Sequence, residues 1–194
     1  MFLLAPIIDK EVPQNEKKFY INGSLEIIST PMYGQGKVYN DYGQGFYCTE
    51  SLELAKEWSC AEREDGYVNQ YEMDETGLLI LNLMEKHYSV LHWLAILMKY
   101  RKIRLSSAVM KRGREWLLEH FLPDVDGYDV VIGYRADDSY FSFARAFVNN
   151  EISLEQLSYA MRTGKLGEQY VIKESEAFHG RIHFLSYEGV YYVE

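Results

Sequence analysis

The chain has 194 residues, of which 47% are hydrophobic and 15% aromatic, and its formal net charge is −9. A chain of this size and apolar content is expected to fold as one domain, residues 1–194, around a buried core. The pI near 5.1 argues against a protein that grips nucleic acid through sequence-independent phosphate contacts. We expect no membrane span, because no segment approaches the ~20 apolar residues that one requires.

Two features favour a cytoplasmic location. The N-terminus, MFLLAPIIDKEVPQ, has an apolar run too short for a secretory core and lacks a basic leader, so it is expected to form an initial strand or a clamp on the domain. Cys48 and Cys60 have no metal-ligand partners at a recognised spacing and are expected to be reduced. The sequence therefore predicts neither a disulfide nor a metal site.

The first expected element is a short strand over Lys18–Ile21, which leads into Asn22-Gly23-Ser24. Taken alone, this Asn-Gly pair is typical of a plain turn. Residues 26–37 contain Pro31 and two glycines and are expected to form a loop.

The stretch 41–60, DYGQGFYCTESLELAKEWSC, changes its pattern twice. Residues 41–45 predict a glycine-rich turn, and 46–49 predict a strand of aromatic and β-prone residues. A helix follows, with Thr49 or Ser51 as its cap. Tyr47 and Trp58 are eleven residues apart, so a strand that folds back beside its helix could hold both rings over one cavity.

The remaining elements follow from periodicity and turn residues. We expect strands at 67–73 and 78–83 joined by a tight turn, then helices at 89–101 and 107–121, and then a central strand at 128–133. Two further helices should follow: one runs through Asn149 and is capped by Asp137 or Asp138, and the other begins at the capping box Ser153–Gln156. The chain should end with a strand around 169–172 and a closing hairpin of 181–187 and 190–193 around Glu188-Gly189.

Several charged and aromatic side chains have simple interpretations. His87 and His92 lack ligands at metal spacing, Trp93 and Trp116 are expected to have packing roles, and His183 is expected on a solvated face. One basic cluster is either a solvated helix face or a docking patch for a phosphate-bearing or acidic partner; it consists of Arg101, Lys102, Arg104, Lys111, Arg112 and Arg114.

The G-x-G-F-Y-C strand, followed by a helix with an aromatic residue eleven positions after the tyrosine, resembles the nicotinamide-binding segment of ADP-ribosyltransferases. The likeness is to the branch that includes poly(ADP-ribose) polymerases and diphtheria toxin. From Phe19 to Phe184 the chain resembles a bacterial family of uncharacterised proteins grouped with these enzymes, through FYINGSLEI, YNDYGQGFYCTE, DDSY and GEQYVIK. The resemblance implies an α+β fold of split antiparallel sheets around an NAD cleft, with flanking helices.

The resemblance also implies how NAD would be held. Nicotinamide would lie between Tyr47 and Trp58, whose ring faces suit a cationic pyridinium. The carboxamide would be held at Gly23 and Ser24. Asn22 stands where the family usually has histidine, and it would bind the far ribose, since asparagine both donates and accepts hydrogen bonds.

By the same resemblance, the catalytic glutamate position falls on Gln169, with Glu168 one residue earlier. Adjacent strand residues point to opposite faces. Either Gln169 bonds the near ribose with weaker charge stabilisation, or a bulge turns Glu168 inward, or Glu168 is a solvent-facing edge residue. Thr49 is a further candidate for cofactor binding. Arg135 either clamps a neighbouring aspartate or bonds the NAD pyrophosphate.

Three functions follow from these expectations. The first is mono-ADP-ribosyl transfer from NAD to an unknown protein or nucleic-acid acceptor, as a toxin paired with a cognate antitoxin or as a phage-defence component. The second is a catalytically degenerate domain that binds NAD or ADP-ribose, which Asn22 and Gln169 favour. The third is a structural or interaction protein with the cleft filled.

Overall fold

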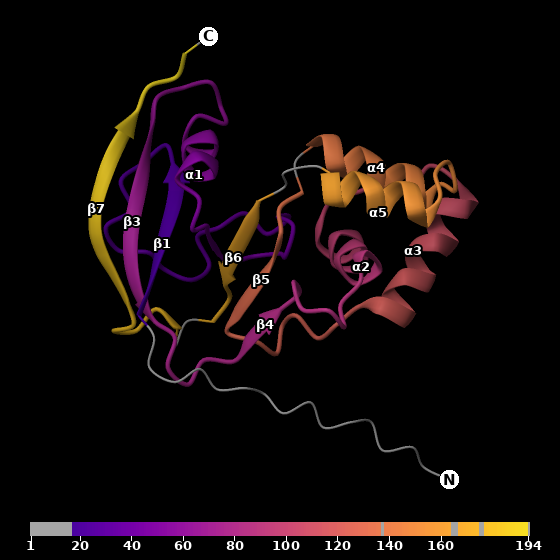
Figure 1. Ribbon diagram of the computed structural model, residues 1–194, viewed down its shortest axis with the longest axis horizontal. Coiled ribbons are helices and arrows are strands. Elements are labelled where there is room, and N and C mark those ends of the chain that lie inside the picture. Colours follow the sequence, from indigo (N-terminus) through magenta and orange to yellow (C-terminus); the bar gives the residue numbers. More distant parts are fainter. Residues whose placement is uncertain (1–16, 137, 164–166, 175–176, 194) are drawn as a thin grey trace.

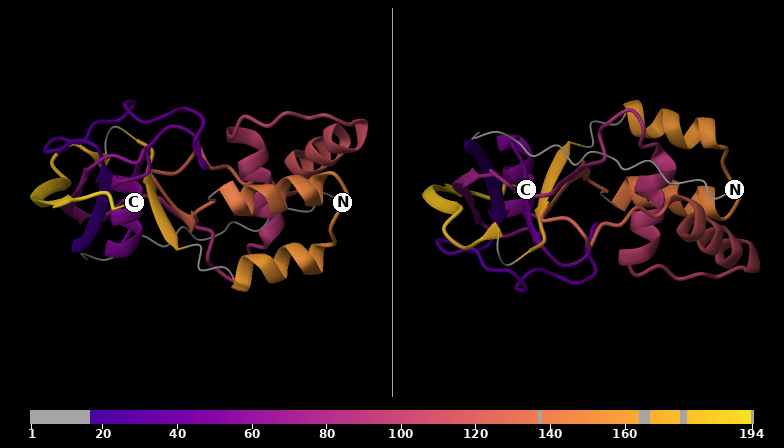
Figure 2. Two further views of the ribbon diagram at one scale, coloured as in Figure 1. Left: turned by 90° about the horizontal axis from the view of Figure 1, so that it is seen from above. Right: turned by 90° about the horizontal axis from the view of Figure 1, so that it is seen from below.

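The structure is a computed structural model that describes residues 17–136, 138–163, 167–174 and 177–193. It has three layers: a three-stranded sheet, a four-stranded sheet and a group of helices on the far side of the second sheet (Figure 1). The views from above and below show the same order (Figure 2). The expected α+β class is confirmed. The elements are β1 (Lys17–Ser24), β2 (Phe46–Cys48), α1 (Leu52–Ser59), β3 (Gly66–Asp74), β4 (Ile80–Asn82), α2 (Val90–Tyr100), α3 (Ala108–Phe121), β5 (Val130–Tyr134), α4 (Asp138–Val148), α5 (Leu154–Thr163), β6 (Glu168–Ile172) and β7 (Ile182–Val190).

The two sheets differ in strand direction. The first has the order β1-β3-β7 and is antiparallel throughout. The second has the order β2-β6-β5-β4, and its β4–β5 pair is parallel. The expectation of two antiparallel sheets is therefore wrong for this pair. The chain leaves β4, passes through α2 and α3, and returns in β5, and such a helical crossover brings a strand back in the same direction.

One bridge joins the sheets at their edges. The backbone N–H and carbonyl groups of Ile21 and Thr49 exchange two hydrogen bonds of 2.8 Å. Beyond this bridge the sheets separate, and an inter-sheet core fills the space with side chains that include Tyr20, Phe46, Tyr71, Val130 and Ile172. The opposite face of the second sheet packs on a helical core that includes Leu94, Leu97, Leu117, Val131 and Leu157.

Helix α1 packs directly on the first sheet, apart from the other helices (Figure 1). Its cap is Ser51, whose Oγ accepts from the backbone N–H of Leu54 at 3.3 Å. A Cβ atom on Gly23 would lie 1.9 Å from the carbonyl oxygen of Ala55, and one on Gly66 would lie 2.1 Å from that of Ser59. Glycine at these two positions is what allows the helix to approach the strands.

The helix signals read from the sequence are largely confirmed. Ser153 and Gln156 form the expected capping box, with hydrogen bonds of 2.8 and 3.3 Å. Ser89 and His92 form another at the start of α2. Both tryptophans expected to pack do so, Trp93 in the core and Trp116 on the surface, where it is 47% exposed. On the surface of α3, the Trp116 ring stacks on His120 four residues later.

The closing hairpin predicted around Glu188-Gly189 is wrong. Residues Ile182–Val190 form the single strand β7, in which Glu188 pairs with Val68 and Gly189 with Tyr67. The nine-residue strand β3 offers a long edge, and its backbone groups are satisfied by a partner that continues straight through the glycine. His183 is exposed, as expected.

The turn at 74–77 joins the two sheets and makes no hairpin. The Leu78 N–H donates to the Glu75 carbonyl at 3.0 Å, and Gly77 has a φ of 78°, as the tight turn requires. The chain then enters β4 in the second sheet. The expected N-terminal strand or clamp and the cap at Asp137 lie outside the described residues.

A polar cluster ties the helical layer to the second sheet. Lys173, which is 7% exposed, donates to the Tyr42 carbonyl at 2.8 Å and pairs with Asp126 at 3.1 Å. Asp126 also accepts from Lys99 at 2.7 Å and from Tyr100 at 2.6 Å. Partial burial opposes ionisation of Asp126, but these hydrogen bonds hold the pKa of its carboxyl well below the usual range.

This low pKa predicts a contribution to stability that acid removes. The contribution is present above the unfolded-state pKa of about 3.9 and declines as the pH falls below it. We therefore expect the stability difference between the wild type and Asp126→Asn to be largest near neutral pH and to shrink below about pH 4. Urea unfolding at several pH values measures it, and a difference that is constant with pH would contradict the assignment.

The close contact of α1 with Gly23 predicts that one methyl group added at this position lowers the stability of the protein. Gly23→Ala should destabilise the protein by about 1–3 kcal/mol, because the new Cβ meets helix backbone that cannot rotate away. The control is Gly189→Ala in β7, where a Cβ meets nothing within 4 Å, and it should change the free energy of unfolding by less than about 0.5 kcal/mol. Equal values for the two variants in urea titrations would show that the close approach has no energetic weight.

Candidate functional site

The glycine turn before β2 is held by the tyrosine that follows it. The Tyr47 hydroxyl donates to the Gly43 carbonyl at 2.7 Å and accepts from the Tyr42 N–H at 3.0 Å. Gly43 has a φ of 81°, a conformation that favours glycine. Burial raises the pKa of the Tyr47 hydroxyl, which therefore stays protonated and can make both bonds. Tyr47 thus fixes the glycine-rich turn that precedes β2.

The structure does not place Tyr47 and Trp58 over one cavity. In β2, Phe46 and Cys48 face the inter-sheet core, while Tyr47 packs against the helical core on the opposite face. Trp58 lies half-buried on α1, which packs on β1 and β3. Among the described residues, no ring contact joins Tyr47 to Trp58. Strand alternation separates them, because Tyr47 lies on the face of β2 turned away from α1.

Asn22 lies at the bridge between the sheets. Its side chain is buried, with 8% of the residue exposed, and its Nδ2 donates to the Tyr47 carbonyl at 2.9 Å. Its Oδ1 is buried and has no hydrogen-bond partner among the described residues. The bond made by Nδ2 fixes the amide orientation, since a flip would set two carbonyl-type oxygens against each other. Asn22 therefore presents an unsatisfied acceptor at the junction.

The neighbours of Asn22 have backbone roles. The Ser24 Oγ accepts from the Glu26 N–H at 3.2 Å. Thr49 is buried, and its Oγ1 donates to the Glu168 carbonyl at 2.9 Å while accepting from the Ser51 N–H at 3.1 Å. Thr49 thus connects the end of β2, the start of α1 and the head of β6. This brings the Asn-Gly-Ser, Tyr-Cys-Thr and Glu-Gln motifs to one place.

Glu168 and Gln169 point to opposite faces of β6. Gln169 is 2% exposed, and its Nε2 donates to Asp41 at 3.0 Å and to the Tyr134 carbonyl at 3.1 Å. Glu168 is exposed at the head of the strand. The pairing with β5 runs without a shift from Ile172 to Glu168, so no bulge turns Glu168 inward. Gln169 is held beneath the site, and Glu168 is the residue at its edge.

A second carboxylate, Glu50, accompanies Glu168. Cys48 pairs with Tyr170 in antiparallel register, so continuation of the register sets Glu50 opposite Glu168. Burial raises the pKa of the Tyr170 hydroxyl, and its hydrogen-bonding interaction with Glu50 and the charge of Glu168 raise it further. Glu50 is not among the site residues predicted from the sequence. Its position beyond the end of a three-residue strand gave no periodic signal.

Asp41 is a buried hydrogen-bond acceptor beneath the edge that carries Glu168 and Glu50, and it too is not among the site residues predicted from the sequence. It is 5% exposed and accepts from Arg101 at 2.7 Å, from the Ala136 N–H at 2.7 Å and from Gln169. These bonds join the glycine turn, the end of α2, the segment after β5, and β6. The available signal was weak, because an aspartate before Tyr-Gly also suits an ordinary turn.

Arg135 makes an ion pair that the sequence did not predict. Its guanidinium pairs with Glu57 on α1 at 2.8 Å, and its backbone N–H donates to the Gly167 carbonyl at 3.3 Å. Asp137 lies outside the described residues, and the side chain of Asp138 is not described. The arginine therefore ties α1 to the end of the second sheet, although its partner Glu57 is largely exposed.

The basic cluster divides into separate roles. Arg101 pairs with Asp41, Arg114 donates to the Met98 carbonyl at 2.9 Å, and the Lys102 ammonium lies 3.8 Å from the centre of the Tyr39 ring. Arg104, Lys111 and Arg112 are exposed. At least two of the cations thus stabilise the fold, and sequence spacing alone could not separate them from the surface ones.

The described ranges contain neither a metal-binding cluster nor a membrane-spanning helix. No group of three or more His, Cys, Asp or Glu side chains within them could hold a metal ion. Within the same residues, no helix is long and apolar enough to cross a membrane. Cys48 and Cys60 are free thiols, as expected.

The Asp41 network predicts a large loss on truncation. Asp41→Ala leaves Arg101 and Gln169 without their shared acceptor, and we expect a loss of about 3 kcal/mol of unfolding free energy. This loss is at the low end of what removal of one partner from a buried ion pair costs, because 22% of the Arg101 side chain is exposed. Glu62→Ala removes an exposed carboxylate and should change stability by less than about 0.5 kcal/mol. Urea titrations compare them, and a similar loss in both variants would refute the central role of Asp41.

Comparison with known proteins places the chain in a family. A family model described as "Protein of unknown function (DUF3990)" matches residues 19–184, which run from the third residue of β1 to the third residue of β7 and contain helices α1 to α5. No curated protein matches significantly. No solved structure does so either. The matched range is close to that of the motifs quoted from the sequence. The chain belongs to the DUF3990 family of proteins of unknown function.

Proposed function

We propose that the junction of the two sheets binds NAD and transfers its ADP-ribose unit to a macromolecular acceptor. Support comes from the convergence of three separate sequence motifs at one point. Asn22 bonds to the Tyr47 carbonyl, and Thr49 bonds to the Glu168 carbonyl. Residues from positions 22, 47 and 168 thus meet around the Ile21–Thr49 bridge between the sheets.

The observation that carries the proposal is the unsatisfied Oδ1 of Asn22. An acceptor buried without a partner costs about 1–3 kcal/mol, so a fold retains one only where something else compensates. A ribose hydroxyl of the bound dinucleotide would donate to this oxygen. An asparagine there can therefore fill the ribose-binding role for which the resemblance implied histidine.

Glu168 is the catalytic residue in this proposal. As the bond between the nicotinamide nitrogen and the ribose breaks, positive charge develops on the sugar, and a fixed carboxylate at the edge of the site stabilises it. A nucleophile of the acceptor forms the new bond to the anomeric carbon and loses its proton, while nicotinamide leaves as a neutral molecule. Glu50 adds to the negative potential at the same edge.

Tyr47 and Gln169 then have positioning roles. Tyr47 fixes the glycine turn through two hydrogen bonds, and Gln169 joins Asp41 to the end of β5. Both side chains face the helical side of the second sheet. Their substitution should change the shape of the site without removing a group that touches the substrate.

A second candidate function is binding of NAD or ADP-ribose without transfer. It is favoured by the contact of α1 with Gly23, since the helix backbone occupies the space beside the strand where the carboxamide would be held. The glutamine at position 169 favours it too. In either case the acceptor or partner is a macromolecule, and a toxin with a cognate antitoxin in the cytoplasm is the setting that we propose.

The test follows label from NAD. Purified protein is incubated with NAD labelled in its adenylate part and with whole-cell lysate, while released nicotinamide is measured. We expect label in macromolecules with the wild type, and a loss of at least ~100-fold with Glu168→Gln, because one preorganised electrostatic group is removed. Glu174→Gln, an exposed glutamate just past the other end of β6, should retain full activity.

The outcomes separate the two candidates. Asn22→Ala should weaken NAD binding in calorimetry, because the acceptor for the ribose is lost. Stabilisation of the wild type by NAD without label transfer or nicotinamide release would establish the binding function instead. If NAD neither binds nor is consumed, both candidates are wrong.

A further inference from the structure

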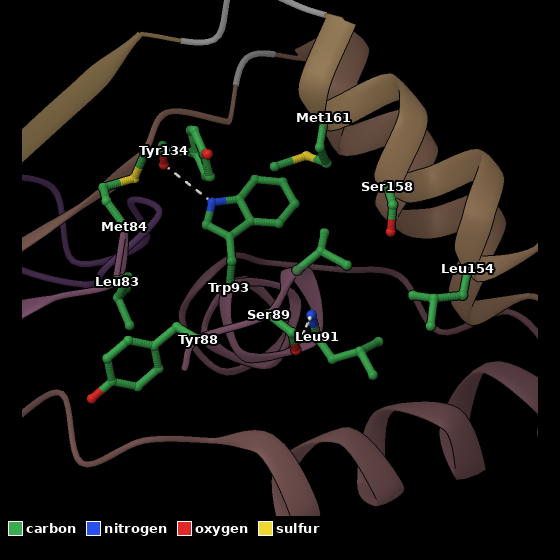
Figure 3. A pocket seen from close by; sticks show the side chains of 11 residues that line it. Leu83, Met84, Tyr88, Ser89, Leu91, Trp93, Tyr134, Leu154, Ser158 and Met161 are labelled. Atoms are coloured by element: carbon green, nitrogen blue, oxygen red, sulfur yellow. Dashed lines mark hydrogen bonds between the residues drawn. The ribbon is translucent and has the colours of Figure 1, made fainter. Parts of the chain in front are cut away.

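A pocket of about 280 Å³ opens on the helical side of the second sheet (Figure 3). Its walls come from the segment after β4, the first half of α2, the end of β5, and α5. The junction described above lies at the edge between the two sheets. The pocket is therefore a separate feature, formed where the parallel strands β4 and β5 end.

The lining is mainly apolar and has no charged side chain. None of the residues around the pocket is Asp, Glu, Lys, Arg or His. Its surface is supplied mainly by three aromatic side chains, two thioethers and three leucines, among them Tyr88, Trp93, Met84, Met161 and Leu91. A charged ligand would lose its hydration here without an ionic partner, so the lining favours a neutral molecule. Thioethers at ring edges favour an aromatic one.

The polar groups of the lining are few, and two have internal partners. The Trp93 Nε1 donates to the Tyr134 carbonyl at 3.1 Å, which fixes the indole as one wall (Figure 3). Ser89 is engaged as the cap of α2 and bonds to His92. Ser158 differs, since its hydroxyl points into the pocket in Figure 3.

We propose that this pocket binds a small neutral aromatic molecule that carries one hydrogen-bonding group. The ring lies against Trp93 between Met84 and Met161, and its hydroxyl or amide bonds to Ser158. A volume near the lower end of known ligand sites, about 300–1,000 Å³, suits a single ring with a short substituent. Such a ligand is distinct from NAD, which is larger and carries charged phosphates.

The pocket has one direct connection to the candidate site. The Tyr134 carbonyl that accepts from Trp93 also accepts from the Tyr42 hydroxyl at 2.9 Å and from Gln169 at 3.1 Å. A ligand against the indole therefore lies two hydrogen bonds from the strand that carries Glu168. Binding in the pocket does not depend on whether NAD binds at the junction.

The test uses 4-methylphenol as the probe and the indole N–H signals of the full chain. The protein has three tryptophans, and their ¹⁵N–¹H signals are assigned with Trp58→Phe and Trp116→Phe, which leave Trp93 by elimination. During titration we expect the Trp93 signal to shift and to saturate below about 10 mM, while the other two stay in place. A Trp93 signal that does not move, or three signals that drift together without saturation, would overturn the proposal.

Substitutions in α5 locate the binding. Ser158→Leu fills the pocket and should abolish the saturable shift, while Ser158→Ala removes only the hydroxyl and should weaken binding about fivefold. Tyr159→Leu is the matched control on the same helix, where the side chain is 65% exposed, and it should bind like the wild type. Unchanged affinity in both Ser158 variants would place the probe elsewhere and overturn the proposal, whether or not NAD is bound or consumed.

Discussion

The arrangement of the site depends on the hydrogen bonds that the buried Asp41 carboxylate accepts. It accepts hydrogen bonds from Arg101, Ala136 and Gln169, which belong to segments far apart in the sequence. A carboxylate in this position is stable only while its donors remain, and the donors are placed only while the carboxylate remains. These hydrogen bonds fix the glycine turn, the C-terminal end of α2 and strand β6 relative to one another.

The two faces of strands β2 and β6 have different roles. One face of each, with Tyr47 and Gln169, faces the helical layer and is hydrogen-bonded to the glycine turn, at Gly43 and Asp41. The other, with Tyr170 and the exposed Glu168, faces the first sheet. The residues that the sequence suggested as catalytic therefore separate into those that support the site and those at its edge. Strand alternation alone enforces this separation.

The helical layer covers one face of the second sheet and also determines the relative direction of strands β4 and β5. Its crossover through α2 and α3 sets the parallel pair β4–β5, and the ends of these strands leave room for the pocket beside Trp93. The same indole donates to the carbonyl of Tyr134, which is shared with the support of the candidate site. The pocket and the support of the candidate site thus share one backbone carbonyl.

The sequence by itself determined the α+β class, most helices with their Ser caps, and the central strand β5, because these follow from local periodicity and capping. It also placed Glu168 and Gln169 on opposite faces. Only the tertiary structure decided that Tyr47 faces the helices, that Arg135 pairs with Glu57, and that the tail is one strand. Each depends on a partner distant in sequence, and local patterns carry no information about such partners.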